Sequence, residues 1–301
     1  MRKENKIFVV TGTTAVGKTE LSLACAEANN AEILCCDSTT VYRGMDIGTA
    51  KPTGEEQARV PHHGLDLVEP NEKFSVGDYV AYAQKSVEEI FSRGKSVLVS
   101  GGSGFYLKSF FSSVTDDLEI PETVRKRVAE ILSRGNAFSE QVLRELNDGG
   151  NAAPASFDWE NPRRVAKGLE RCLASGKTLA ELKAEFDSRE CVFSKYPKYT
   201  ILLTRNKEDL NSRIGIRVKK MISDGLIDEV RRLSSVGILR ANTPAGNAIG
   251  YRETLSWLSE GEPGGIPALA EIISLSTRQL AAKQRKWFRT QIPVDEIREL
   301  S

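Results

Sequence analysis

Short apolar runs alternate with amphipathic stretches through much of the chain. The apolar runs stop at polar or glycine-rich points and predict buried strands at 6–11, 32–36, 96–100 and 199–204. The amphipathic stretches predict helices at 18–29, 77–93, 207–235 and 267–290. Strands that alternate with helices are typical of a parallel sheet covered on both faces. The pattern therefore predicts an α/β fold.

The pattern changes between residues 115 and 197. Helical periodicity continues there at 121–135, 138–147 and 162–175, but no strong strand pattern appears. Polar break points at SSVTDD and SKYPKY suit surface linkers on either side. We therefore expect a catalytic core made of residues 1–114 and 198–301, with an all-helical insertion domain at 115–197.

The most specific motif is the GTTAVGKT run, which fits G-x-x-x-x-G-K-[ST] between a predicted strand and a predicted helix. In a P-loop of this kind, backbone N–H groups face a phosphate, the lysine adds a charge and the last hydroxyl can hold Mg²⁺. The predicted phosphate-binding residues are Gly12, Thr13, Thr14, Ala15, Val16, Gly17, Lys18 and Thr19. We expect Thr19 to contact the metal and Mg²⁺ to be the cofactor.

A P-loop predicts polyphosphate binding but not ATP hydrolysis. The strand at 96–100 leads into a second glycine turn, Gly101–Gly104, where a nucleotidase would carry an acid for Mg²⁺. Only the strand at 32–36 ends in an acid, Asp37. That carboxylate could hold Mg²⁺, act as a general base or cap a helix, and the residues alone leave these readings open.

Composition and charge narrow the class of protein. The 301 residues carry a net charge of +1, but residues 1–122 hold 12 Lys and Arg against 18 Asp and Glu, and the rest hold 30 against 23. The net charge is thus −6 in the first part of the chain and +7 in the second. This asymmetry suggests that one part carries out the chemistry and the other binds a polyanion. The five cysteines lack CxxC spacing, and no membrane span or signal peptide is evident, so we expect a cytoplasmic protein.

The only two histidines, His62 and His63, are adjacent in the chain. They could suggest a metal, but adjacent side chains point in different directions, so a structural role is favoured.

Cations cluster at 163–171 and along the last helix, where no acid occurs between 272 and 294. These clusters predict either solvated helix faces or contacts to nucleic-acid phosphates.

The chain resembles the tRNA dimethylallyltransferases, also called tRNA isopentenyltransferases. Besides the P-loop, the matching motifs are CDSTTVYRGMDIGTAKP at 36–52, PHHGLDLVEP at 61–70, GGSGFYLK at 101–108, ENPRRVAKGLE at 160–170, SGKTLAEL at 175–182, AIGYRE at 248–253 and TRQLAAKQRKWFR at 277–289. They follow the family's order and cover nearly the whole chain.

The resemblance implies a P-loop NTPase-like core whose P-loop holds the diphosphate of dimethylallyl diphosphate. It also implies that Asp37 is the general base on the target adenosine, that Ser103 lies near the reacting amine, and that Arg217 binds the diphosphate. It implies tRNA contacts at Asp37, Ser38, Thr39, Thr40, Ser103, Arg125, Arg163, Arg164, Val165, Ala166, Lys167, Asn247, Ala248, Ile249, Gly250, Tyr251 and Arg252. The insertion would then grip the anticodon stem.

The expected reaction prenylates the adenosine 3′ of the anticodon in tRNAs that read U-initial codons. The alternatives are an enzyme that prenylates free adenine nucleotides, a P-loop kinase of a small metabolite and a non-enzymatic RNA-binding module. We expect a monomer. The chain departs from the family at Thr13, usually Pro, at Thr40, often Gln, at 157–160, which usually carries a His-Pro pair, and at Ala282, part of a usual Lys-Arg pair.

Overall fold

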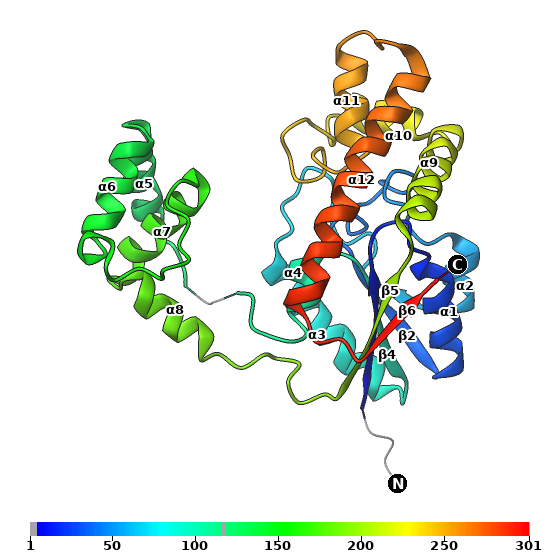
Figure 1. Ribbon diagram of the computed structural model, residues 1–301, viewed down its shortest axis with the longest axis horizontal. Coiled ribbons are helices and arrows are strands. Elements are labelled where there is room, and N and C mark those ends of the chain that lie inside the picture. Colours follow the sequence, from blue (N-terminus) through cyan, green and yellow to red (C-terminus); the bar gives the residue numbers. More distant parts are fainter. Residues whose placement is uncertain (1–4, 116–117, 301) are drawn as a thin grey trace. The chain divides into compact units, whose positions relative to one another are not determined.

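The computed structural model describes residues 5–115 and 118–300, which form two compact units. One unit comprises residues 1–114 and 192–301, and the other comprises residues 115–191. Sequence reasoning placed the second boundary at 197/198, six residues later than this division. The α/β fold class expected from the sequence is confirmed (Figure 1).

A sheet of six strands forms the centre of the first unit. The strands are β1 (Ile7–Gly12), β2 (Ala31–Cys36), β3 (His62–His63), β4 (Ser96–Gly101), β5 (Lys198–Thr204) and β6 (Glu296–Glu299). Their order across the sheet is β3-β2-β4-β1-β5-β6, and every neighbouring pair is parallel. The sequence pattern predicted the four longest strands; β3 and β6 are too short to show a periodicity.

Helices cover the sheet because each parallel pair needs a crossover connection. The helices of this unit are α1 (Lys18–Ala28), α2 (Gly54–Arg59), α3 (Val76–Ser92), α4 (Gly104–Lys108), α9 (Lys207–Ser223), α10 (Leu226–Ser235), α11 (Tyr251–Ser259) and α12 (Gly265–Gln291). The chain runs from β1 through α1 to β2, and then returns through α3 to β4, which lies between β2 and β1. Right-handed crossovers in opposite directions place α1 and α3 on opposite faces of the sheet (Figure 1).

The long helix expected at 207–235 is two helices. α9 ends at Ser223 and α10 begins at Leu226, because Gly225 takes a φ of 106°, which a helix interior does not allow. Residues of α9, α10 and α11 pack in one apolar core together with Val41, Tyr42 and Met45. Of the helices among the described residues, none is both long and apolar enough to cross a membrane.

The second unit is entirely helical in its described part. It contains α5 (Glu122–Ser133), α6 (Asn136–Glu145), the 3₁₀ turn η1 (Asp148–Gly150), α7 (Pro162–Ser175) and α8 (Leu179–Asp187). Val128, Leu143, Val165 and Leu169 lie in its own apolar core. The buried Asn147 side chain ties the helices together, because it donates to the Leu143 carbonyl at 2.8 Å and accepts from the Leu179 N–H at 2.6 Å.

A buried carboxylate organises the DIGT segment of the first unit. Glu229 of α10 accepts from the backbone N–H groups of Asp46 and Ile47 at 3.0 Å each, and of Gly48 at 3.3 Å. It also accepts from the Tyr251 hydroxyl at 2.5 Å. A Cβ on Gly48 would lie 2.4 Å from the Tyr251 ring, so only glycine allows this approach. The DIGT and AIGYRE motifs therefore stabilise one another.

Lys51 stabilises the C-terminal end of the DIGTAKP segment by three hydrogen bonds. Its ammonium donates to the Tyr42 carbonyl at 2.9 Å and to the carboxylates of Asp46 and Asp66 at 2.6 Å each. The Lys51 side chain is only 5% exposed, so these partners replace the water it gives up on folding. The DIGTAKP run that follows β2 is thus a packed structural element.

Removal of the Glu229 carboxylate should destabilise the protein more than removal of an exposed one. Glu229→Ala leaves three partly buried N–H groups and a buried hydroxyl without their acceptor, and we expect a loss of about 2–4 kcal/mol in the free energy of unfolding. Urea unfolding followed by tryptophan fluorescence measures it. Glu208→Ala, at an exposed site on α9, is the matched control and should change it by less than about 0.5 kcal/mol. Equal losses for both would contradict the anchoring role.

Candidate active site

The GTTAVGKT run forms a loop between β1 and α1, the setting that the motif requires. β1 ends at Gly12 and α1 begins at Lys18. The Lys18 ammonium folds back over the loop and donates to the carbonyls of Gly12 at 3.0 Å and Thr13 at 2.8 Å. Thr19 lies exposed in the first turn of α1. Lys18 and the start of α1 together provide positive potential for an anion.

Two arginines that sequence reasoning missed support the P-loop. Arg213 of α9 donates from Nε to the Ala15 carbonyl at 3.0 Å, and Arg205 donates from Nε to the Val16 carbonyl at 3.3 Å. Arg205 also pairs with Asp209 and is almost fully buried. These bonds hold the loop in place by two of its carbonyls.

Arg217 and Asp37 lie close enough to Lys18 to influence its pKa. Burial and the positive charge of Arg217 lower the pKa of Lys18 from 10.5 to about 8, and Asp37 partly opposes that shift. Burial also lowers the pKa of Arg217, again opposed by Asp37. The structure thus brings together three of the residues singled out in the sequence. Two poorly hydrated cations beside one acid favour the binding of a multiply charged anion.

The chain turns sharply at Asp37. Its Oδ1 accepts from the Thr39 N–H at 2.9 Å and from the Thr39 hydroxyl at 2.7 Å, which is an Asx-turn. The helix-capping role weighed for this carboxylate is wrong, because the residues after it form a turn and not a helix. Oδ2 accepts no hydrogen bond from the described part of the chain, so this oxygen can take a proton.

Ser103 connects the second glycine turn to the Asp37 turn. Its Oγ accepts from the Ser38 N–H at 2.8 Å and donates to Ser38 Oγ at 3.2 Å. Its own N–H donates to the Cys36 carbonyl at 3.2 Å. The structure therefore joins Ser103 to Ser38, the neighbour of Asp37. Thr40 is buried at the same turn.

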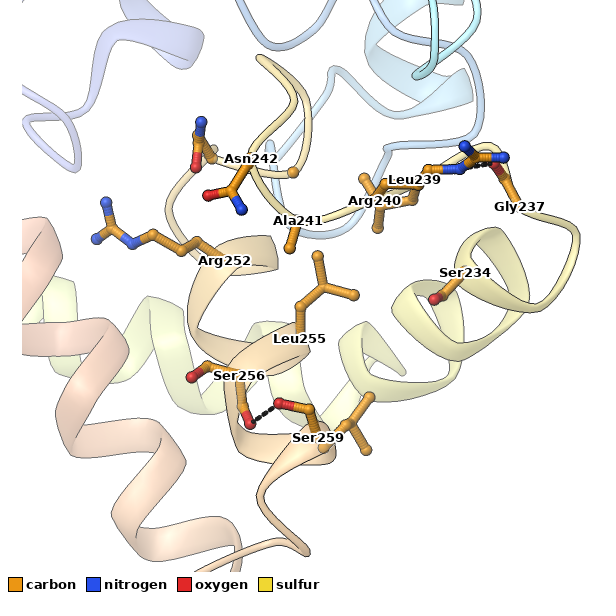
Figure 2. A pocket seen from close by; sticks show the side chains of 13 residues that line it. Ser234, Gly237, Leu239, Arg240, Ala241, Asn242, Arg252, Leu255, Ser256 and Ser259 are labelled. Carbon is orange, nitrogen blue, oxygen red and sulfur yellow. Dashed lines mark hydrogen bonds between the residues drawn. The ribbon is translucent and has the colours of Figure 1, made fainter.

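The third segment expected to contact tRNA, 247–252, divides into buried and accessible residues. Ala248 and Tyr251 are buried, Tyr251 against Glu229, so their side chains serve the fold. Asn247 and Arg252 line a cavity of about 720 Å³ between α10, the loop after it and α11 (Figure 2). The other lining residues are Ser234, Gly237, Leu239, Arg240, Ala241, Asn242, Gly246, Leu255, Ser256, Leu258 and Ser259. This cavity is separate from the P-loop, since neither the P-loop nor Asp37 lines it.

In the helical unit, α7 carries the basic cluster. Arg163, Arg164 and Lys167 are exposed, and Asn161 caps the helix by accepting from the N–H groups of both arginines. Val165 is a correction to the expected contact set, because it is 3% exposed in the core of this unit and its side chain cannot reach a ligand. Ala166 is partly exposed, and on α5 Arg125 is exposed.

The histidine pair plays a structural role. His63 Nε2 lies 2.7 Å from the buried Glu32 carboxylate, which Arg93 also contacts at 2.7 Å, and His62 Nδ1 lies 2.7 Å from the Val60 carbonyl. Within residues 5–115 and 118–300, no group of three or more His, Cys, Asp or Glu side chains is arranged to hold a metal.

Sequence comparisons agree with this site. A family model described as IPP transferase matches residues 40–291. A tRNA dimethylallyltransferase from Opitutus terrae is 49% identical over 290 residues, which cover 96% of this chain and 91% of that protein. Another from Bacillus velezensis is 38% identical, with 97% of this chain and 90% of that protein covered. The likeness thus extends through the P-loop and the helical unit alike.

Solved structures give the same result. A full-length tRNA isopentenylpyrophosphate transferase from Bacillus halodurans matches with a TM-score of 0.69 at 31% identity, covering 98% of this chain and 90% of that one. A eukaryotic dimethylallyltransferase described as acting on tRNA matches with a TM-score of 0.83 at 25% identity, covering 98% and 74%. On this evidence, the chain belongs to the IPP transferase family of tRNA dimethylallyltransferases.

Proposed function

We propose that the protein transfers a dimethylallyl group from dimethylallyl diphosphate to the N6 amine of the adenosine 3′ of the anticodon, in tRNAs that read U-initial codons. The products are N6-isopentenyladenosine and diphosphate. The observation that carries this proposal is the carboxylate of Asp37 beside the two partly buried cations Lys18 and Arg217 at a P-loop. The names of the family and of the relatives support the same reaction.

Asp37 acts on the acceptor. The exocyclic amine of adenine is a poor nucleophile, because its lone pair is delocalised into the ring. Asp37 Oδ2 accepts a proton from N6 while N6 forms the new bond to the allylic carbon. Oδ1 stays bonded to Thr39, so the turn fixes the direction in which the carboxylate points.

Lys18 and Arg217 act on the leaving group. As the bond between the allylic carbon and oxygen breaks, negative charge grows on the departing diphosphate. Buried cations that are already in position stabilise this charge without reorganising water. Lys18 can exchange its bonds to the Gly12 and Thr13 carbonyls for bonds to diphosphate oxygens. The P-loop thus binds the donor's diphosphate and not ATP.

The exposed Thr19 hydroxyl fits Mg²⁺, because this ion prefers oxygen ligands. When bound, Mg²⁺ would supply additional charge stabilisation to the diphosphate. Thr19 would hold it, because this hydroxyl follows Lys18 at the start of α1.

The acceptor is tRNA and not a free nucleotide. The exposed cations of α7, Arg163, Arg164 and Lys167, lie on a helical unit with its own core, and a free adenine nucleotide would need no such footprint. The solved structure of a eukaryotic relative that is described as acting on tRNA supports this choice. A kinase is disfavoured because β4 ends in a glycine turn where an acid for Mg²⁺ would stand. Monomeric state and cytoplasmic location stay predictions.

Transfer should proceed without ATP. We expect the purified protein to modify an anticodon stem-loop with Mg²⁺ and dimethylallyl diphosphate alone, and to modify AMP poorly. Mass spectrometry of the digested RNA and of AMP measures both products, with diphosphate release as a second readout. ADP formed in step with product would favour the kinase. Equal efficiency on AMP would favour the free-nucleotide enzyme.

Asp37→Asn should reduce turnover far more than donor binding. Asparagine retains an acceptor for Thr39 but cannot take the proton, so we expect kcat to fall by ~10²-fold or more. Thr39→Val is the matched control, because it removes the hydroxyl bond of the turn and leaves the carboxylate. A larger loss for Thr39→Val than for Asp37→Asn would assign Asp37 to the turn alone.

Diphosphate affinity should fall above about pH 8. Free Lys18 has a pKa lowered to about 8, so above that pH the neutral amine must take up a proton before it pairs with the anion. Isothermal titration with inorganic diphosphate at pH 8.5, in two buffers of different ionisation enthalpy, reports that uptake. In Lys18→Arg the guanidinium stays charged, so proton uptake should disappear. Equal uptake by both proteins would assign the proton to another group.

A further inference from the structure

One side chain of α12 joins the two glycine loops of the site. Gln284 accepts from the Thr14 N–H of the P-loop through Oε1 at 2.8 Å. It donates from Nε2 to the Gly102 carbonyl of the second glycine turn at 3.0 Å. Thr14 and Gly102 follow neighbouring strands, β1 and β4. Both ends of one amide therefore bridge the donor loop and the turn beside it.

The Gln284 side-chain amide is tightly packed against Gly102. A Cβ on Gly102 would lie 2.9 Å from Gln284 Nε2 and 3.3 Å from the Gly12 carbonyl oxygen. Gln284 is itself partly buried, while its neighbours Lys283 and Arg285 are exposed. Of this basic run in α12, Gln284 thus turns inward and the flanking cations face solvent.

The bridge continues toward the proposed base. Gly102 precedes Ser103, whose Oγ accepts from the Ser38 N–H at 2.8 Å, and Ser38 follows Asp37. One amide and one hydroxyl therefore connect the P-loop to the turn that carries Asp37. A change at Gln284 alters the spacing between the loop that holds the donor and the carboxylate that faces the acceptor.

We propose that Gln284 is a positioning residue that sets this spacing, an inference that rests on the proposed function. It touches neither reacting atom; it holds the diphosphate loop and the Ser103–Asp37 turn at the separation that in-line attack requires. Misplacement of reacting groups by about 1 Å can cost ~10²-fold in rate, so a spacer of this kind acts on the chemical step. Binding of each substrate alone depends on it less.

Only a side chain that both accepts and donates a hydrogen bond can bridge these two loops. A carboxylate accepts from Thr14 but faces the Gly102 carbonyl with no proton, and a thioether of similar length does neither. Gln284→Glu and Gln284→Met therefore remove one half and both halves of the bridge. Gln279→Met, at an exposed position of the same helix, is the matched control.

The experiment measures single-turnover transfer to an anticodon stem-loop at saturating dimethylallyl diphosphate, together with KM for the RNA. It also measures hydrogen exchange at the Thr14 amide by NMR in each protein. We expect Gln284→Met to slow transfer by ~10–100-fold with KM changed less than about twofold, and to speed Thr14 exchange. Gln284→Glu should keep Thr14 protected yet still slow transfer, and Gln279→Met should match the wild type. If Gln284→Met does not fold, Gln284→Glu carries the test.

An unchanged transfer rate in a folded Gln284 variant would overturn the inference, and so would a rise in KM alone, which would make Gln284 an RNA contact. If the wild type transfers nothing to RNA, the proposed function fails and the positioning role fails with it. If the wild type and the Gln284→Met protein are equally active, only the positioning role is contradicted. The two failures are therefore distinguishable in one set of measurements.

Discussion

The hydrogen bonds that join β2, β4 and β1 align the last residues of the three strands: Cys36 pairs with Gly101, and Gly101 pairs with Thr11. Parallel strands end at a common edge, so three loops of different chemistry begin at almost the same level. An acid follows β2, a glycine turn follows β4 and the P-loop follows β1. The sheet register brings them to one edge, and a slip by one residue would separate them.

The cations at this edge of the sheet lose water when the protein folds, and this desolvation destabilises the fold. Lys18 and Arg217 are both desolvated, which lowers their pKa values, and Asp37 supplies the nearest opposite charge. Lys18 is paired with two carbonyls of its own loop, which are weaker partners than diphosphate oxygens. In the proposed reaction, a bound diphosphate would supply opposite charge to both cations and so compensate for the water that they give up on folding.

Local patterns predicted the four long strands, the P-loop and Asp37, because strand periodicity and loop chemistry are local properties. Two short helices, α2 and α8, also had readable signals: Thr53 with Glu56 and Thr178 with Glu181 form capping boxes. Glu229 and Gln284 could not be predicted in the same way. Each binds backbone groups more than 180 residues away, and a polar residue on a helix appears solvent-facing until the fold is known.

The position of the acid decides what a P-loop can do. In nucleoside triphosphatases an acid near the phosphates serves Mg²⁺ and the attack on phosphorus. Here the strand next to β1 ends in a glycine turn, and the acid stands one strand farther away, after β2. A carboxylate at that distance is better placed for a nucleophile that approaches the far end of the donor than for a water at the phosphates. In the proposed reaction the same loop holds a leaving group, and the bond that breaks lies between carbon and oxygen.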